Sequence, residues 1–259
     1  MVVEAGYSRW HPLVILLGCV ERFGYRIADT IVGTMPNLAE HVGRVMEKKL
    51  DCRCIPLGYD PEAYGSQEPL PDGYETRYVP EGKFIVGYTG NLGVSNAMDT
   101  LIDCVAQMRD ADHIHFLIVG DGDLLERYKA QTSDLENITF APKVKKSQVP
   151  SILARCQVVY FSARESEVWR YGQSLNKVIE YMMAGKPIIA SYSGHPSMID
   201  EAECGVFVPA SDVRALSMAI LEYARRPSAE LQAMGRRGRA WVMEHRSYRR
   251  LAEEYAKLF

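Results

Sequence analysis

The feature that most constrains the fold is a regular alternation of short apolar segments and amphipathic segments from Lys83 onward. The pattern predicts strands at 84–88, 115–119, 138–141, 158–162, 188–191 and 205–208. Helical patterns separate these strands, and strands that alternate with helices form parallel βαβ units. The sequence therefore predicts an α/β fold with a doubly wound parallel sheet. Ligands of such a sheet lie at the carboxyl ends of its strands.

The first 60 residues follow a shorter pattern. They predict helices at 12–28 and 37–47 and strands at 30–34 and 52–57. Residues 61–80 are rich in Pro, Gly, Glu and Tyr and predict a linker. We expect residues 1–78 to form a short α/β unit with its linker, and residues 79–259 to form the main domain with three helices at its end. Two strands and two helices bury too little apolar surface to be stable alone, so the short unit must pack on something else.

The segment 174–187, S-L-N-K-V-I-E-Y-M-M-A-G-K-P, predicts the most informative site. Ser174, Asn176 and Lys177 lie at the expected N-terminus of a helix, where free N–H groups favour an anion. Glu180 follows about one turn later, and a carboxylate there can accept hydrogen bonds from the two hydroxyls of a ribose. The helix ends at a Gly that is soon followed by a Pro. We interpret the segment as a holder for a nucleotide diphosphate.

Two glycine-containing loops follow predicted strands. The first is Gly90, Asn91, Leu92 and Gly93, which either lets a phosphate approach the backbone or forms a plain tight turn. The second is Gly120, Asp121, Gly122 and Asp123. Its two Asp residues fit the D-x-D clamp of metal-dependent sugar transferases; alternatively, Asp123 caps the next helix while the glycines form the floor of a nucleotide pocket. We favour the cap and the pocket floor, and we expect no metal.

A few other polar residues have two interpretations each. His195 follows a strand and a Ser-Gly pair, which suits a role facing the substrate. Glu165 and Glu167 lie in a polar loop that either covers a ligand or is solvated. His113 and His115 flank the start of a buried strand and are predicted to be edge or core residues.

The composition of the chain limits the classes of partner that we expect for it. The net charge of −3 argues against nucleic acid. The Arg-rich region 225–250 is a solvated helix surface or a contact with acidic lipid. The longest apolar run, 13–20, is too short to span a bilayer, although it could rest on one. With no secretory signal and no C-x-x-C pair, we expect a cytoplasmic protein without disulfides, at most peripheral at the inner face of the membrane.

In their order along the chain, the motifs resemble those of the C-terminal, donor-binding domain of family 4 retaining glycosyltransferases of the GT-B fold. The resemblance runs from about residue 84 to the end and rests on T-G-N-L-G, F-L-I-V-G-D-G-D, E-Y-M-M-A-G-K-P-I-I-A and G-V-F-V-P-A-S-D. The S-L-N-K tetrad is similar to the S-P-N-K of bacterial transferases that build cell-surface polysaccharide. Residues 10–60 resemble only the last part of the family's N-terminal domain, through H-P-L, E-R-F-G-Y-R-I-A-D-T-I-V and I-P-L-G-Y-D. The chain thus looks like one Rossmann-like GT-B half preceded by a remnant of the other.

The resemblance implies a nucleotide-diphospho-sugar donor, bound without a metal or other cofactor. It implies that the loop 90–93 holds the diphosphate, that the backbone around Lys143 and Val144 binds the base, and that Glu180 binds the ribose.

The chain departs from the family in two places. Gly172 stands where the family's E-x7-E pair has its first carboxylate, and the first glycine loop lacks the family's Arg and Lys. We expect Lys177 to supply the missing positive charge. The earlier strands, which in the family carry the acceptor site and usually a catalytic His, have no counterpart here, so no catalytic residue is assigned.

The sequence is therefore interpreted as a glycosyltransferase, or its donor-binding part, that transfers a sugar to a hydroxyl of a saccharide or lipid-linked acceptor. One alternative is a non-catalytic nucleotide-sugar-binding module or a subunit of a split enzyme. A nucleotide-sugar epimerase is a further alternative. Because the unit 1–78 needs cover, we also expect self-association or a partner chain.

Overall fold

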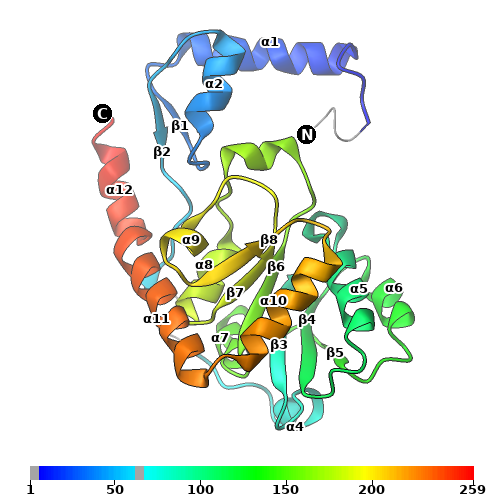
Figure 1. The fold of residues 1–259 in the computed structure, drawn as a ribbon. Coiled ribbons are helices and arrows are strands. Elements are labelled where there is room, and N and C mark those ends of the chain that lie inside the picture. The colour runs from blue at the N-terminus through cyan, green and yellow to red at the C-terminus, as the bar shows by residue number, and fades with distance from the viewer. Residues whose placement is uncertain (1–5, 62–66) are drawn as a thin grey trace.

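The computed structural model describes residues 6–61 and 67–259, and its centre is a six-stranded parallel sheet (Figure 1). The strand order is β5-β4-β3-β6-β7-β8, and every neighbouring pair is parallel. The strands are β3 (Phe84–Asn91), β4 (Ile114–Asp121), β5 (Ile138–Ala141), β6 (Val158–Ser162), β7 (Ile188–Ser191) and β8 (Gly205–Val208). The predicted α/β fold with a doubly wound parallel sheet is confirmed.

Helices cover both faces of the sheet, because successive residues of a buried strand point to opposite faces. On β3, Val86 and Tyr88 belong to one buried cluster, whereas Ile85 belongs to the other. The first cluster lies under α5 (Asp99–Gln107), α6 (Leu125–Gln131) and α10 (Val213–Arg225). The second lies under α7 (Val149–Leu153), α8 (Asn176–Met183), α9 (Met198–Glu201) and α11 (Ser228–His245). The sheet is therefore a rigid middle layer.

The order of the strands fixes where a ligand can bind. The chain starts the sheet at β3, adds β4 and β5 on one side, and then crosses to β6 on the other side. Such a reversal opens a crevice at the carboxyl ends of the two strands that flank it. The loops after β3 and β6 lie at this crevice, and α8 follows β6 along the chain.

The segment predicted as a linker is partly ordered on the main domain. A short helix, α4 (Tyr74–Tyr78), begins after Gly73, whose φ of +72° suits glycine. The buried Tyr74 donates a hydrogen bond from its hydroxyl to the Pro142 carbonyl at 2.6 Å. The segment predicted as a linker, 61–80, thus contains a short helix, because the buried Tyr74 fixes it beside the end of β5. Its residues 62–66 lie outside the described part of the chain.

The N-terminal unit precedes the sheet and is much smaller. It consists of α1 (Pro12–Ile27), β1 (Ile31–Gly33), α2 (Leu38–Met46) and β2 (Cys52–Cys54). The strands are shorter than predicted, and they pair in parallel as a separate two-stranded sheet. In the described residues, no helix is long and apolar enough to cross a membrane.

The N-terminal unit is fastened to the main domain through backbone and side-chain contacts. The Asn37 N–H donates to the Tyr171 carbonyl at 3.0 Å. Gly172 has a φ of +93°, and a Cβ there would lie 2.5 Å from the Pro36 ring, so this position must stay small. Further on, Tyr59 exchanges backbone hydrogen bonds with the turn between α11 and α12 (Tyr248–Ala256). The unit therefore meets the domain at the loop that contains Tyr171 and Gly172 and at the turn between α11 and α12.

Candidate functional site

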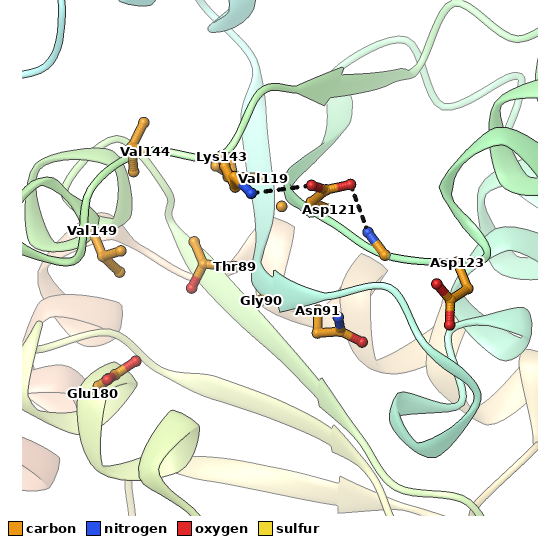
Figure 2. A pocket seen from close by; sticks show the side chains of 12 residues that line it. Thr89, Gly90, Asn91, Val119, Asp121, Asp123, Lys143, Val144, Val149 and Glu180 are labelled. Carbon is orange, nitrogen blue, oxygen red and sulfur yellow. Dashed lines mark hydrogen bonds and ion pairs between the residues drawn. The ribbon is translucent and has the colours of Figure 1, made fainter.

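A pocket of about 590 Å³ lies at the carboxyl ends of β3, β4 and β5 (Figure 2). We call it the sheet-edge pocket. The predicted residues that line it are Gly90, Asn91, Gly120, Asp121, Gly122, Lys143, Val144 and Glu180. Thr89, Val119, Asp123 and Val149 complete the lining. Segments that are far apart in the sequence thus meet in one cavity.

The loops 90–93 and 120–123 pack so closely against each other that side chains would not fit at some of their positions. A Cβ on Gly120 would lie 1.9 Å from the Gly90 carbonyl oxygen, and one on Gly122, at φ +153°, would lie 2.7 Å from the Leu92 backbone. The Leu92 N–H donates to the Asp121 carbonyl at 2.8 Å. Leu92 itself is fully buried and, like Gly93, does not line the pocket. These glycines are therefore needed to join the loops, whatever ligand the loops hold.

Lys177 brings a positive charge to the first glycine loop from the N-terminal turn of α8. Its Nζ donates hydrogen bonds to the Tyr88 hydroxyl at 2.7 Å and to Asn96 Oδ1 at 3.0 Å. A Cβ on Gly90 would lie 2.9 Å from this Nζ. The Tyr88 hydroxyl in turn donates to the Asn91 carbonyl at 2.7 Å. The ammonium therefore lies against the loop that the sequence predicted to hold a diphosphate.

Burial lowers the pKa of the Lys177 ammonium from its usual range to about 8, because a charged group loses solvation in a partly buried position. The carboxylate of Glu180 works in the other direction but is the smaller influence. An anion that entered the pocket would favour the protonated ammonium.

Glu180 lies across the sheet-edge pocket from Asp121 and Lys143, as Figure 2 shows. Its side chain is 27% exposed, and its Oε1 is 3.8 Å from Nζ of the well-exposed Lys146. Burial raises the pKa of Glu180, although the nearby Lys146 and Lys177 partly oppose this. A carboxylate in this position faces the cavity with acceptor capacity to spare for ligand hydroxyls.

Asp121 and Asp123 both line the pocket but have different surroundings. Asp121 accepts hydrogen bonds from Lys143 Nζ at 3.2 Å and from the Gly122 N–H at 2.9 Å, and the bond from Lys143 lowers its pKa. The predicted cap at Asp123 was wrong: α6 begins after Leu124, and no side chain caps it. The Leu124 N–H instead donates to the Leu92 carbonyl at 3.0 Å, so the contact between the loops sets the start of the helix.

Among the described residues, no group of three or more His, Cys, Asp or Glu side chains could hold a metal ion. The expected independence from metal remains a prediction.

The polar residues predicted to form one cluster at the start of α8, Ser174, Asn176 and Lys177, contact different parts of the structure. Ser174 uses its Oγ to accept a hydrogen bond from the Leu57 N–H at 2.8 Å, which ties the N-terminal unit to the domain. Asn176 lines a different cavity of about 490 Å³, together with Tyr59, Tyr248 and, shared with the sheet-edge pocket, Glu180. Neighbouring helix residues point about 100° apart, so one turn cannot aim all of them at one ligand.

His195 and the loop around Glu165 and Glu167 form a third cavity, of about 540 Å³, against the start of α2. His195 Nδ1 lies 2.9 Å from Nδ2 of Asn37. The loop thus lies beside the N-terminal unit while its Glu165 and Glu167 stay exposed, and a substrate in this cavity stays a prediction. The core role predicted for His115 is confirmed: it is buried, bonds Thr139 at 2.9 Å, and has its pKa lowered to about 4 by burial.

The residues that sequence reasoning missed include strand ends and loop partners. Thr89 and Val119 lie near the carboxyl ends of β3 and β4, a position that could have indicated them. Tyr88 and Asn96, the partners of Lys177, gave no signal, because nothing local shows that a residue 81 to 89 positions away will bond to them.

A family model described as glycosyl transferases group 1 matches residues 83–226, which contain the whole sheet-edge pocket. The chain belongs to this family. No curated protein matches the chain. Solved structures do, and the family assignment agrees with the GT-B fold of those structures.

Three solved glycosyltransferase structures illustrate this likeness, which concerns the fold. Sucrose-phosphate synthase from Thermosynechococcus elongatus is 22% identical, with a TM-score of 0.72 over 94% of this chain and 61% of its own. HepE from Anabaena, in complex with UDP and glucose, is 14% identical, with a TM-score of 0.72 over 98% of this chain and 68% of its own. TarM from S. aureus, in a complex that contains UDP, is 15% identical, with a TM-score of 0.70 over 91% of this chain and 44% of its own. The chain therefore spans about half to two thirds of these proteins.

Proposed function

We propose that the chain binds a nucleotide-diphospho-sugar in the sheet-edge pocket and is the donor-binding part of a glycosyltransferase that modifies a hydroxyl acceptor. One observation carries the proposal: the ammonium of Lys177 lies against Gly90, which lines the pocket together with Glu180, although Lys177 itself is not part of the lining. Family membership supports it independently.

The diphosphate belongs at the first glycine loop. That loop has no Arg or Lys, so the nearby cations come from elsewhere: Lys177 lies against Gly90, and Lys143, which is bonded to Asp121, lines the same pocket. Backbone N–H groups of the loop add dipoles of the same sign. Fixed positive charge there stabilises the diphosphate as it leaves the sugar, because the donors need no rearrangement during the reaction.

The remainder of the nucleotide fits the two other sides of the pocket. Glu180 offers carboxylate oxygens to the ribose hydroxyls. The backbone at Lys143 and Val144, next to the apolar Val149, suits a flat base. No metal is required in this scheme.

The finer identity of the substrate rests on resemblance. HepE has been solved in complex with UDP, with UDP and glucose, and with UDP-glucose, so UDP-sugars are the first donors to test. The S-L-N-K tetrad favours a role in bacterial cell-surface polysaccharide synthesis, with a saccharide or lipid-linked acceptor.

A binding panel tests the proposal. UDP, GDP and their sugars are titrated into the full chain by calorimetry, with and without EDTA. We expect one diphosphate to bind with EDTA present, and at 100 times its Kd to stabilise the fold by about 2.7 kcal/mol. No binding of any nucleotide diphosphate would overturn the donor site, and binding that depends on Mn²⁺ and is lost in Asp121→Asn would overturn its metal independence.

One observation also favours a second candidate, a non-catalytic module or one subunit of a split enzyme: of its described residues, the N-terminal unit contributes only Asn37 and Glu40 to the lining of the cavity beside His195. Product formation by the chain alone separates this candidate from a complete transferase.

A further inference from the structure

Lys143 brings an ammonium group to the lining of the sheet-edge pocket, where a carboxylate holds it. Among the described residues that line the pocket, Lys143 is the only Lys or Arg, whereas Asp121, Asp123 and Glu180 are acidic. Lys177 adds a cation against the first glycine loop but does not line the cavity. An anion that enters the pocket therefore meets more carboxylates than ammonium groups, and the position of the Lys143 side chain affects how strongly it is repelled.

The partner of Lys143 lies beside the first glycine loop. Nζ of Lys143 is 3.2 Å from Oδ2 of Asp121, as the dashed line in Figure 2 shows. Asp121 ends β4 and is the register neighbour of Asn91, which ends β3 in the first glycine loop. Neighbouring strands lie about 4.8 Å apart, so a turn of the flexible Lys143 side chain can carry its ammonium from Asp121 to an anion held at that loop.

The ion pair between Lys143 and Asp121 is weak enough to exchange. The two side chains are 73% and 60% exposed, and an exposed pair changes an equilibrium by at most about fivefold. A diphosphate carries more charge than one carboxylate and offers several oxygens to an ammonium. Asp121 also accepts a hydrogen bond from the Gly122 N–H at 2.9 Å on its other oxygen, so it is left with a partner when Lys143 leaves. The exchange therefore costs the free protein little.

We propose that the Lys143 side chain is a second cation for the diphosphate, and that Asp121 holds it until the donor binds and then exchanges it for phosphate oxygens. The inference rests on the proposed donor site. It adds a role to the Lys143 side chain, because the proposed base contact uses only the backbone there. Lys143 approaches the diphosphate from the end of β5 and Lys177 from α8. The exchange takes place on binding, so both ammonium groups are in place before the sugar is transferred.

A simpler role for Lys143 makes a different prediction. If Lys143 stays on Asp121 and only neutralises it, Lys143→Ala weakens diphosphate binding by exposing the carboxylate, and the loss disappears in an Asp121→Asn background. If Lys143 transfers to the phosphate, the loss persists in that background and grows, because the carboxylate no longer competes for the ammonium. A double-mutant cycle on ligand affinity therefore separates the two roles. Asp121→Asn keeps a side-chain oxygen for the Gly122 N–H.

The test is calorimetry of the full chain with UDP, GDP and inorganic pyrophosphate, in EDTA, for the wild type, the two single variants and the double variant. We expect Lys143→Ala to weaken diphosphate binding roughly threefold to tenfold in the wild-type background, and up to about fivefold more in Asp121→Asn. Asp121→Asn alone should strengthen this binding by about twofold to fivefold. Uridine and guanosine should lose no affinity with Lys143→Ala. Melting followed by circular dichroism checks the fold of each variant.

Asp123→Asn is the matched background, because it removes the same charge from the same lining without releasing Lys143. The loss caused by Lys143→Ala should there equal the loss in the wild type. A loss that grows as much in Asp123→Asn as in Asp121→Asn shows a general effect of charge and overturns the exchange. A loss that vanishes in Asp121→Asn, or one that is equal for uridine and UDP, also overturns it. In each of these cases, binding of UDP or GDP by the wild type still supports the donor site. A wild type that binds neither diphosphate nor pyrophosphate overturns the proposed function and this inference with it.

Discussion

The main domain and the N-terminal unit of this chain differ in how they bury apolar surface. The main domain has two large buried clusters, one on each face of six strands. In the helices and strands of the N-terminal unit, the buried apolar residues are Ile31 and Val42, and α1 has none. The sheet-edge pocket lies wholly on the main domain, whereas the cavity beside His195 also needs Asn37 and Glu40 of the unit.

This difference in burial bears on two functions, donor binding and acceptor positioning. A pocket on a rigid sheet can hold a donor without help, because its lining is fixed by the core. Positioning an acceptor needs a second wall, and here that wall is a small unit held on by a few polar contacts. The comparison predicts that donor binding belongs to the main domain and that transfer requires more than this chain.

The largest expected effect is on transfer itself. We expect no product from the purified chain with UDP-sugars and lipid-linked acceptors in a radiolabelled-sugar assay, even where calorimetry on the same sample shows donor binding. Positioning both reactants contributes roughly 7–11 kcal/mol to lowering a barrier, and one wall of the cleft supplies only part of that. Robust turnover would contradict the expected difference between the two regions and would mean that the N-terminal unit forms a working acceptor site.

The next largest effect is expected from Lys177→Ala. Losing a hydrogen bond to a charged group costs roughly 1.5–3 kcal/mol, so UDP or GDP affinity should fall about tenfold to a hundredfold. The nucleoside should lose little, because it has no phosphate. Lys145→Ala, which removes an exposed charge outside the pocket, is the control. Equal losses for nucleoside and diphosphate would show that Lys177 is not a phosphate ligand.

Glu180→Gln should weaken nucleotide diphosphate binding by roughly 1–3 kcal/mol, because an amide accepts hydrogen bonds less strongly than a carboxylate. The loss should be smaller for 2′-deoxy-UDP, which already lacks one of the hydroxyls. Calorimetry with both ligands measures this difference. Unchanged affinity for UDP in a folded variant would remove Glu180 from the ribose site.

A pH series sharpens the assignment of Lys177. Burial lowers its pKa to about 8 in the free protein, and a bound diphosphate favours the charged form. Above pH 8 the protein must take up a proton to bind, so UDP affinity should fall, by at most about tenfold per pH unit. Uridine affinity should stay flat from pH 7 to 9. Lys177→Ala should abolish the slope, and a slope that persists would point to another titrating group.

The smallest effect is expected where the two regions meet. Arg170 on the main domain and Glu40 on α2 form an ion pair at 2.6 Å, with side chains 59% and 45% exposed. Exposed pairs contribute about 0.2–1 kcal/mol, so a double-mutant cycle to Ala should give a coupling in that range and no change in UDP affinity. A coupling of several kcal/mol, or a lost donor site, would show that the regions are one cooperative unit.

Much of this protein is determined by local sequence. The alternation after Lys83 specifies strands and helices directly, because period and apolar run length reflect burial on a sheet. Glu180 could be placed because one helical turn separates it from the helix start. Lys177 follows from elimination, because the first glycine loop has no cation of its own. In the structure it lies beside that loop from α8, and its role at a phosphate stays a prediction.

Only the tertiary structure decided how these pieces meet. Tyr88 and Asn96 hold Lys177, and Ser174 bonds Leu57 instead of facing the pocket, because partners far apart in the chain are chosen by packing. The start of α6 is set by the Leu92 carbonyl and not by the nearby Asp123. Local pattern reports how each segment buries its own surface. The direction of a polar side chain depends on which segment arrives beside it, and that information exists only once the sheet has formed.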